Sequence, residues 1–196
     1  MTPPIVLQLP GWLGSGPDHW QSHWERRHGD VRVDQHDWEF PRRGDWMARL
    51  DEVVQAQALP VVLVAHSLGC LLVAAWASVS LHTAGVRGAL LVAPGDVEVE
   101  GGPVPPLPGW RPIVRQRLPF PSVLVASRND PYCTLARARD MAHDWGAEWV
   151  DLGSRGHLNA DSGLGDWPEG RQLIQPWLQA GFNPEIQSQE EEPHSW

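Results

Sequence analysis

The sequence predicts an α/β fold, a three-layer α/β/α sandwich in which a mostly parallel sheet of about six strands lies between two layers of helices. The first observation is a series of short runs rich in Val, Leu and Ile, which are apolar on both faces as buried parallel strands are. The second is that segments with helical spacing separate these runs. This alternation is typical of doubly wound sheets, whose ligands bind beyond the carboxyl ends of the strands.

The elements follow from these runs in order. Strands are expected at residues 4–9, 31–34, 60–65, 88–93, 121–127 and 147–152. Helices are expected at residues 45–58, 68–82, 134–145 and 168–180. Residues 95–119 interrupt the rhythm, because six prolines in this interval are incompatible with a continuous helix. The interval is either a lid over the ligand face or an ordered surface loop, and the sequence leaves both open.

The length and charge of the chain limit its organisation and partners. Its 196 residues suit one domain over residues 1–182, followed by an acidic tail over residues 183–196 that we expect to be disordered. The net charge is −9, which disfavours nucleic acid and anionic membranes as partners and leaves a small-molecule substrate as the expectation. The oligomeric state cannot be predicted from these features.

Several chemistries are excluded or disfavoured by composition. All fifteen basic residues are arginine, so the chain has no lysine for a Schiff base or a phosphate-binding loop. Cys70 and Cys133 form no C-x-x-C pair, and the N-terminus has no basic segment followed by an apolar stretch long enough for export. We therefore expect a cytoplasmic protein without disulfides.

The strongest local signal is the run from Val61 to Leu72, an apolar strand, a short polar turn and an apolar helix. Ser67 lies in the turn, and Ala65 and Gly69 are the small residues that let strand and helix approach around a strained nucleophile elbow. The usual pattern is Gly-x-Ser-x-Gly, so Ala65 departs from it by one methyl group. The alternative is a serine that merely caps the following helix.

An elbow of the α/β-hydrolase type requires an acid and then a histidine later in the chain, each on a loop after a strand. His143 falls inside an expected helix and His194 in the acidic tail. His157 follows the sixth strand by five residues. The sequence therefore predicts His157 as the general base of Ser67.

Two aspartates compete for the role of the acid. Asp140 and Asp144 fall within an expected helix and Asp151 within a strand, which leaves Asp96 after the fourth strand and Asp130 after the fifth. Asp130 ends a strong strand and turn, so we favour it to orient His157, with Asp96 as the alternative.

The remaining site residues are predicted from their loops. The backbone N–H groups of Leu68, after the elbow, and Trp12, in the turn after the first strand, are the expected oxyanion donors. The expected substrate pocket contains Gly11, Trp12, His66 and Trp110. His19 and His23 are four residues apart, but Trp20 stands where a zinc protease needs glutamate and no third ligand is evident, so neither a metal nor another cofactor is predicted.

With these loops assigned, residues 4–181 resemble the small serine hydrolases of the retinoblastoma-binding protein nine (YdeN-like) family. The motifs that carry the resemblance are Gly11-Trp12 with residues 15–20, residues 66–69, residues 115–121 leading into residues 127–132, and residues 156–160 leading into residues 167–170. The resemblance implies a compact sheet without a large cap, the triad of Ser67, Asp130 and His157, and a hydrolase whose natural substrates are generally ill-defined.

The predicted function is cleavage of an ester, thioester or amide through an acyl-enzyme on Ser67, in the manner of a carboxylesterase. Two alternatives stay open. One is an acyltransferase that uses the same triad, and the other is a catalytically silent interaction module, since fold alone does not determine function.

Overall fold

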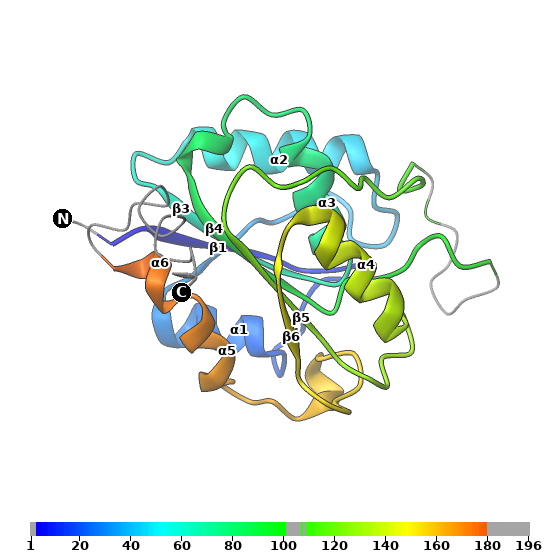
Figure 1. Cartoon of the computed structure of the whole chain (residues 1–196). Coiled ribbons are helices and arrows are strands. Elements are labelled where there is room, and N and C mark those ends of the chain that lie inside the picture. Colours follow the sequence, from blue (N-terminus) through cyan, green and yellow to red (C-terminus); the bar gives the residue numbers. More distant parts are fainter. Residues whose placement is uncertain (1–2, 101–106, 108, 180–196) are drawn as a thin grey trace, which may run out of the picture.

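The computed structural model describes residues 3–100, 107 and 109–179 of the chain. In these residues six parallel strands form one twisted sheet in the order β2-β1-β3-β4-β5-β6 (Figure 1). The strands are β1 (Ile5–Leu9), β2 (Val31–Arg32), β3 (Val61–His66), β4 (Val86–Val92), β5 (Ser122–Ala126) and β6 (Glu148–Asp151). The predicted α/β sandwich is confirmed.

The strands differ in burial in the way their sequences suggest. All residues of β3 and β5 are buried, which fits their continuous apolar runs, whereas the edge strand β6 is only partly covered. The other edge strand, β2, is shorter than the predicted 31–34, because only Val31 and Arg32 pair with β1. The register aligns Ala65 of β3 with Leu9 of β1 and Leu91 of β4, so the elbow leaves from the middle of the sheet.

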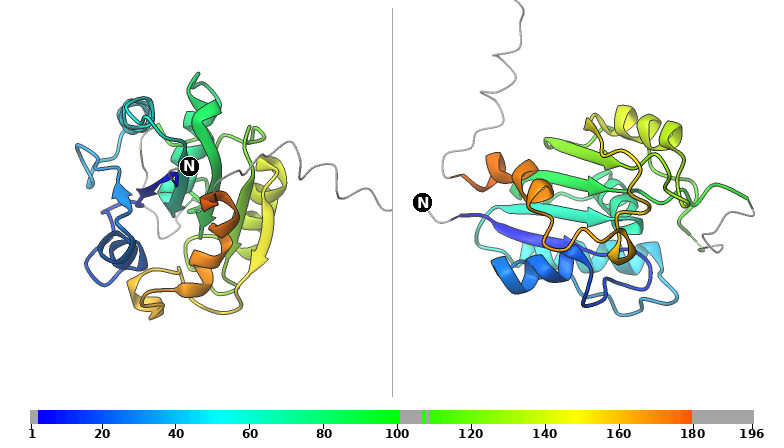
Figure 2. Two further views of the ribbon diagram at one scale, coloured as in Figure 1. Left: turned by 90° about the vertical axis from the view of Figure 1, so that its left-hand side faces the viewer. Right: turned by 90° about the horizontal axis from the view of Figure 1, so that it is seen from below.

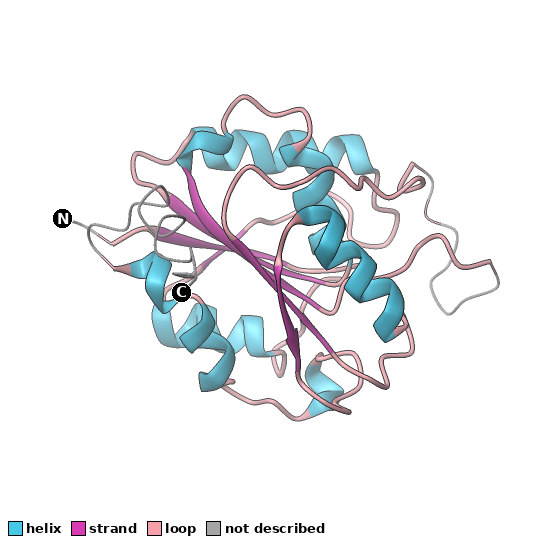
Figure 3. Ribbon diagram, in the orientation of Figure 1, coloured by secondary structure: helices cyan, strands magenta, loops and turns pink. Residues whose placement is uncertain are grey.

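Helices cover both faces of the sheet (Figures 2 and 3). On one face lie α2 (Arg43–Gln55), α3 (Leu68–Ala77) and α4 (Leu135–Trp145). On the other lie α1 (Trp20–His28), α5 (Pro168–Leu173) and α6 (Gln175–Leu178). Two 3₁₀ turns, Thr83–Gly85 and Ala160–Ser162, complete the described elements. Each face of the sheet has its own hydrophobic core. Because the helices cover the faces, the carboxyl ends of the strands stay free to carry loops.

The helices differ from the prediction in number and in length. Helix α1 was not predicted as an element, and α3 ends at Ala77 rather than at residue 82. The predicted final helix is divided at Ile174 into α5 and α6. Pro176 in the first turn of α6 accounts for this division, since proline has no N–H to continue the hydrogen bonds of a preceding helix.

The irregular interval 95–119 is described only in part, because residues 101–106 and 108 lie outside the described residues. Gly95, Val97 and Leu107 of this interval line the pocket above Ser67. The interval therefore contributes to the ligand face, while its movement as a lid stays a prediction. The predicted tail, residues 183–196, also lies outside the described residues. Among the helices that are described, none is long and apolar enough to cross a membrane.

Candidate active site

The turn between β3 and α3 is a strained elbow. Ser67 has φ 54° and ψ −118°, a conformation that residues with a side chain rarely adopt. Gly69 is required beside it, because a Cβ at this position would lie 2.2 Å from the carbonyl oxygen of Leu9. Ala65 is fully buried within β3, so its methyl group is accommodated there. The Ser67 side chain makes no capping hydrogen bond to α3, which rules out the alternative of a helix-capping serine.

The structure brings the three predicted catalytic side chains together. Ser67 Oγ lies 2.9 Å from His157 Nε2, and His157 Nδ1 lies 3.0 and 2.9 Å from the two carboxylate oxygens of Asp130. The carboxylate therefore accepts a hydrogen bond from Nδ1–H, which leaves the Nε2 lone pair for the serine proton. The side chains of His157 and Asp130 are 9% and 2% exposed, so little water competes for this hydrogen bond.

Two side chains of the motif at residues 127–132, to which no role was assigned from the sequence, join the acid and histidine loops. Asn129 Oδ1 accepts hydrogen bonds from Ser127 Oγ at 3.0 Å and from the backbone N–H of Gly156 at 2.8 Å. Ser127 Oγ accepts one from the N–H of Arg155 at 2.9 Å. These contacts fix the loop of His157 relative to the loop of Asp130. The sequence signal was their position directly before Asp130, at the end of a buried strand.

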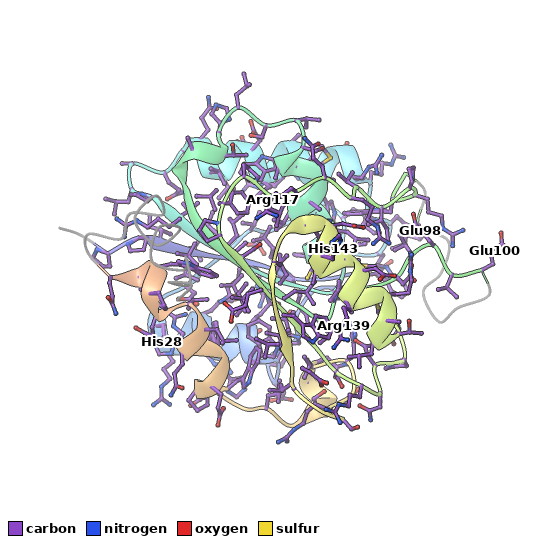
Figure 4. The ribbon with its side chains drawn as sticks, viewed as in Figure 1. His28, Glu98, Glu100, Arg117, Arg139 and His143 are labelled. Carbon is purple, nitrogen blue, oxygen red and sulfur yellow. The ribbon has the colours of Figure 1, made fainter. Side chains whose placement is uncertain are left out.

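Asp96, the alternative acid, serves another purpose. Its carboxylate pairs with Arg137 of α4 at 2.7 and 3.2 Å, and Arg137 also pairs with Glu98, which Figure 4 shows beside α4. Burial alone would raise the pKa of Asp96, but the hydrogen bonds from Arg137 and from the N–H of Glu98, together with the positive charges of Arg137 and Arg115, outweigh it and hold the pKa below its usual value. Asp96 thus anchors α4 to the loop after β4 and is not hydrogen-bonded to His157.

The turn after β1 approaches the nucleophile closely. A Cβ on Gly11 would lie 2.8 Å from Ser67 Cβ and 3.3 Å from Ser67 Oγ, so only glycine fits without displacing the serine. The N–H groups of Leu13 and Gly14 are used, by Trp38 and Gly11. Within the described part of the chain, the N–H groups of Trp12 and Leu68 have no protein acceptor. Both predicted oxyanion donors are therefore available at the turns that flank Ser67.

A pocket of about 180 Å³ opens above Ser67. Of the predicted pocket residues, Gly11, Trp12 and His66 line it. Trp110 does not, and the prediction was wrong for this residue. Its ring is buried against Trp46, and its Nε1–H donates to the carbonyl oxygen of Pro41 at 2.9 Å, which turns the side chain into the core.

Two buried histidines, His66 and His19, lie near the catalytic pocket. The Nε2–H of His66 donates to the backbone carbonyl of His157 at 2.9 Å, and the His66 ring lies 4.8 Å from the His157 ring. His19 is the buried N-cap of α1, because its Nδ1 accepts the N–H of Gln21, and it also lines the pocket. Burial, assisted by His157, lowers the pKa of His19 to about 3, and burial lowers the pKa of His66 as well. Both imidazoles are therefore neutral at neutral pH.

These neutral histidines predict a loss of stability in mild acid. The pKa of His19 is about 3 in the folded protein and 6.5 in the unfolded chain, so below pH 6.5 the unfolded state binds a proton that the folded state does not. The free energy of unfolding should fall by about 2 kcal/mol between pH 6.5 and pH 5 from His19 alone. Urea unfolding at a series of pH values measures this slope.

The matched control is His19→Asn, because asparagine keeps a capping acceptor but does not titrate. His66 titrates in both proteins, so the difference in slope isolates His19. We expect the variant to lose less stability than the wild type over the same pH interval. Equal slopes would contradict a neutral, buried His19.

Neither a metal nor a cysteine nucleophile is indicated by the described residues. Among them, no group of three or more His, Cys, Asp and Glu side chains is arranged to hold a metal ion. Cys70 and Cys133 are buried and unpaired. Burial raises the pKa of the Cys133 thiol to about 12 and raises that of Cys70 further, so neither forms the reactive thiolate at neutral pH.

Comparison with known proteins agrees with this site. Residues 6–176 match the model of the serine hydrolase family. A solved structure described as a YdeN-like hydrolase, from Pectobacterium atrosepticum, is 30% identical with a TM-score of 0.76, over 87% of this chain and 88% of that chain. The YdeN protein from B. subtilis is 20% identical with a TM-score of 0.71, over 89% and 98% of the two chains.

A carboxylesterase from Bacillus cereus is 16% identical with a TM-score of 0.55, over 86% of this chain and 89% of that chain, and shares the fold alone. No curated protein matches the chain. The family match and the first structural relative together decide the family, because one spans most of the chain and the other is similar in sequence along it. The chain belongs to the serine hydrolase family, as a small YdeN-like member of the α/β-hydrolase superfamily.

Proposed function

We propose that the protein hydrolyses a small-molecule ester, thioester or amide through an acyl-enzyme on Ser67. The observation that carries this proposal is the contact of 2.9 Å between Ser67 Oγ and His157 Nε2, with Asp130 on the other ring nitrogen. A carboxylesterase among the proteins with this fold adds support for ester substrates. The net charge of −9 favours a small acyl substrate over nucleic acid.

In the first half of the reaction, Ser67 Oγ attacks the carbonyl carbon of the substrate and its proton passes to His157 Nε2. Asp130 stabilises the imidazolium that forms, and the N–H groups of Trp12 and Leu68 hydrogen-bond to the oxyanion. The tetrahedral intermediate then breaks its bond to the leaving group, which takes the proton from Nε2. The acyl group remains as an ester on Ser67.

In the second half, water attacks the acyl-enzyme and gives a proton to His157 Nε2. The second tetrahedral intermediate collapses, the proton returns to Ser67 Oγ and the free acid leaves. A transferase would use the same residues but an alcohol, thiol or amine in place of this water. The products therefore distinguish the two activities.

Labelling by a fluorophosphonate tests the proposal. We expect the wild-type protein to gain the probe on the peptide that contains Ser67 and to hydrolyse p-nitrophenyl acetate. Ser67→Ala should not be labelled, and His157→Ala should be labelled far more slowly because the serine has lost its base. An unlabelled wild type would indicate the silent interaction module, and equal labelling of Ser67→Ala would contradict Ser67 as the nucleophile. A methyl ester as the main product in dilute methanol would indicate a transferase.

A further inference from the structure

A second, larger cavity adjoins the pocket above Ser67. This apolar groove has a volume of about 1100 Å³ and lies along α2 and α3, which pack side by side (Figure 1). The charged residues Glu39, Arg42 and Arg43 line part of it, and its apolar lining residues are Trp12, Phe40, Pro41, Met47, Ala75, Val79, Leu107 and Val114. Apolar residues predominate in this described lining, which suits a hydrocarbon chain.

The groove and the catalytic pocket share two walls. Trp12 and Leu107 line both cavities, so the two cavities are adjacent and meet at these side chains. The indole of Trp12 is held in place by a hydrogen bond of 2.9 Å from its Nε1–H to the carbonyl oxygen of Glu39, the residue before Phe40. The backbone N–H of the same tryptophan, in the turn that approaches Ser67, has no acceptor in the described part of the chain. A carbonyl group bound at Trp12 thus lies at the entrance to the groove.

The sizes of the two cavities indicate which part of a substrate each can take. The catalytic pocket, at about 180 Å³, is smaller than the roughly 300 to 1,000 Å³ of typical small-molecule sites. It holds a reacting carbonyl but no long chain. Helix α3 begins at Leu68, and Ala75 in the groove wall is seven residues along it, a distance of about 10 Å. An octanoyl chain has a comparable length.

The groove also exposes large apolar side chains. Phe40 is 74% exposed and Val79 is 68% exposed. Apolar surface of this kind, next to a reactive serine, is stabilised when a hydrocarbon covers it. Burying each additional CH₂ group corresponds to roughly a fourfold gain in binding.

We propose that the apolar groove holds the acyl chain of the substrate while Ser67 attacks its carbonyl, so that the enzyme acts on medium-chain acyl esters or thioesters. This inference rests on the proposed hydrolase function, because it takes Ser67 as the nucleophile. The leaving group then points away from the groove, past His157, which protonates it.

The test is a series of p-nitrophenyl esters from acetate to octanoate, measured as kcat/KM. For the wild type we expect a rise with acyl length, by at least about tenfold from acetate to octanoate. Val79→Trp fills the groove and Phe40→Ala removes one wall, so each should reduce the ratio of the octanoate to the acetate kcat/KM several-fold. Leu81→Trp is the matched control, because Leu81 is 93% exposed and does not line the groove.

A second series varies the alcohol instead, from ethyl to octyl butyrate. Dependence on the length of the alcohol, or a preference for octanoate that both groove variants retain, would overturn the acyl-chain assignment. So would equal rates for acetate and octanoate in the wild type. Acetate turnover that depends on Ser67 would still support the hydrolase in each of these cases. Failure of labelling and of acetate turnover together would instead contradict the proposed function.

Discussion

Replacement of Ser67 by alanine is expected to lower kcat for a short ester on the order of 10⁵-fold, with little change in KM. The reason is that the serine supplies the covalent step, whereas the walls of the pocket bind the substrate. The residual rate should still exceed that of the uncatalysed reaction, because the N–H groups of Trp12 and Leu68 can still stabilise an oxyanion formed by direct attack of water. Steady-state kinetics with p-nitrophenyl butyrate measures both constants.

The control is Ser122→Ala. This buried serine in β5 has no hydrogen-bond partner for its hydroxyl among the described residues, and it lines neither the pocket nor the groove. Its kcat should equal that of the wild type. If Ser67→Ala retained more than a tenth of the wild-type kcat while remaining folded, Ser67 would not be the nucleophile.

The positions of Ser67, Asp130 and His157 could be predicted because they depend on local sequence. An apolar strand followed by small residues around Ser67 defines the elbow, and parallel strands bring their carboxyl ends to one edge of the sheet. His157 and Asp130 follow two such strands. The order of the elements along the chain was therefore enough to predict that both residues lie near Ser67. Ala65 shows that alanine is tolerated at this position, since it keeps its place in β3 and pairs with Leu9 of β1.

His19 and α1 were missed because their burial depends on distant contacts. The buried face of α1 includes the polar residues Gln21 and Ser22, which mask any apolar periodicity. Gln21 is satisfied by Ser15 Oγ and by the carbonyl oxygen of Val64. Trp20 donates to the carbonyl oxygen of Leu158, 138 residues away, which fixes the helix beneath the histidine loop. Sequence spacing carries none of this information.

The error over Trp110 has a different cause. Its loop was assigned to the ligand face, and residues of that loop do reach the pocket, Leu107 among them. The direction of one side chain in a loop, however, depends on the partner that its polar atom finds, and the indole N–H of Trp110 bonds to Pro41. Membership of this loop therefore predicted correctly that the segment reaches the pocket, but it did not predict whether the side chain of Trp110 does.

Asp130→Asn is expected to lower kcat by about 10⁴-fold while the protein stays folded. The amide can still accept the N–H of Tyr132, which the carboxylate accepts at 2.8 Å in the wild type. Its NH₂ group, however, would face His157 Nδ1 and favour the tautomer with the proton on Nε2. That nitrogen could then no longer accept the proton of Ser67. Steady-state kinetics, together with thermal unfolding, separates this effect from a loss of structure.

Asp96→Asn is the matched variant, because Asp96 was the other candidate acid and is also buried. Here the structure predicts the opposite pattern. Loss of the charge weakens the pairing with Arg137 and should lower the free energy of unfolding by about 1 to 3 kcal/mol. The activity of the folded fraction should stay close to that of the wild type, since His157 keeps its partner.

Activity and stability, measured for both variants, identify the acid that orients His157 in two independent ways. Asp130→Asn should be inactive and stable, and Asp96→Asn should be active and less stable. An active Asp130→Asn together with an inactive, fully folded Asp96→Asn would make Asp96 the acid in solution. That outcome would require the loop after β4 to release Arg137 and turn toward His157, and the two hydrogen bonds that hold Asp96 to Arg137 oppose this movement.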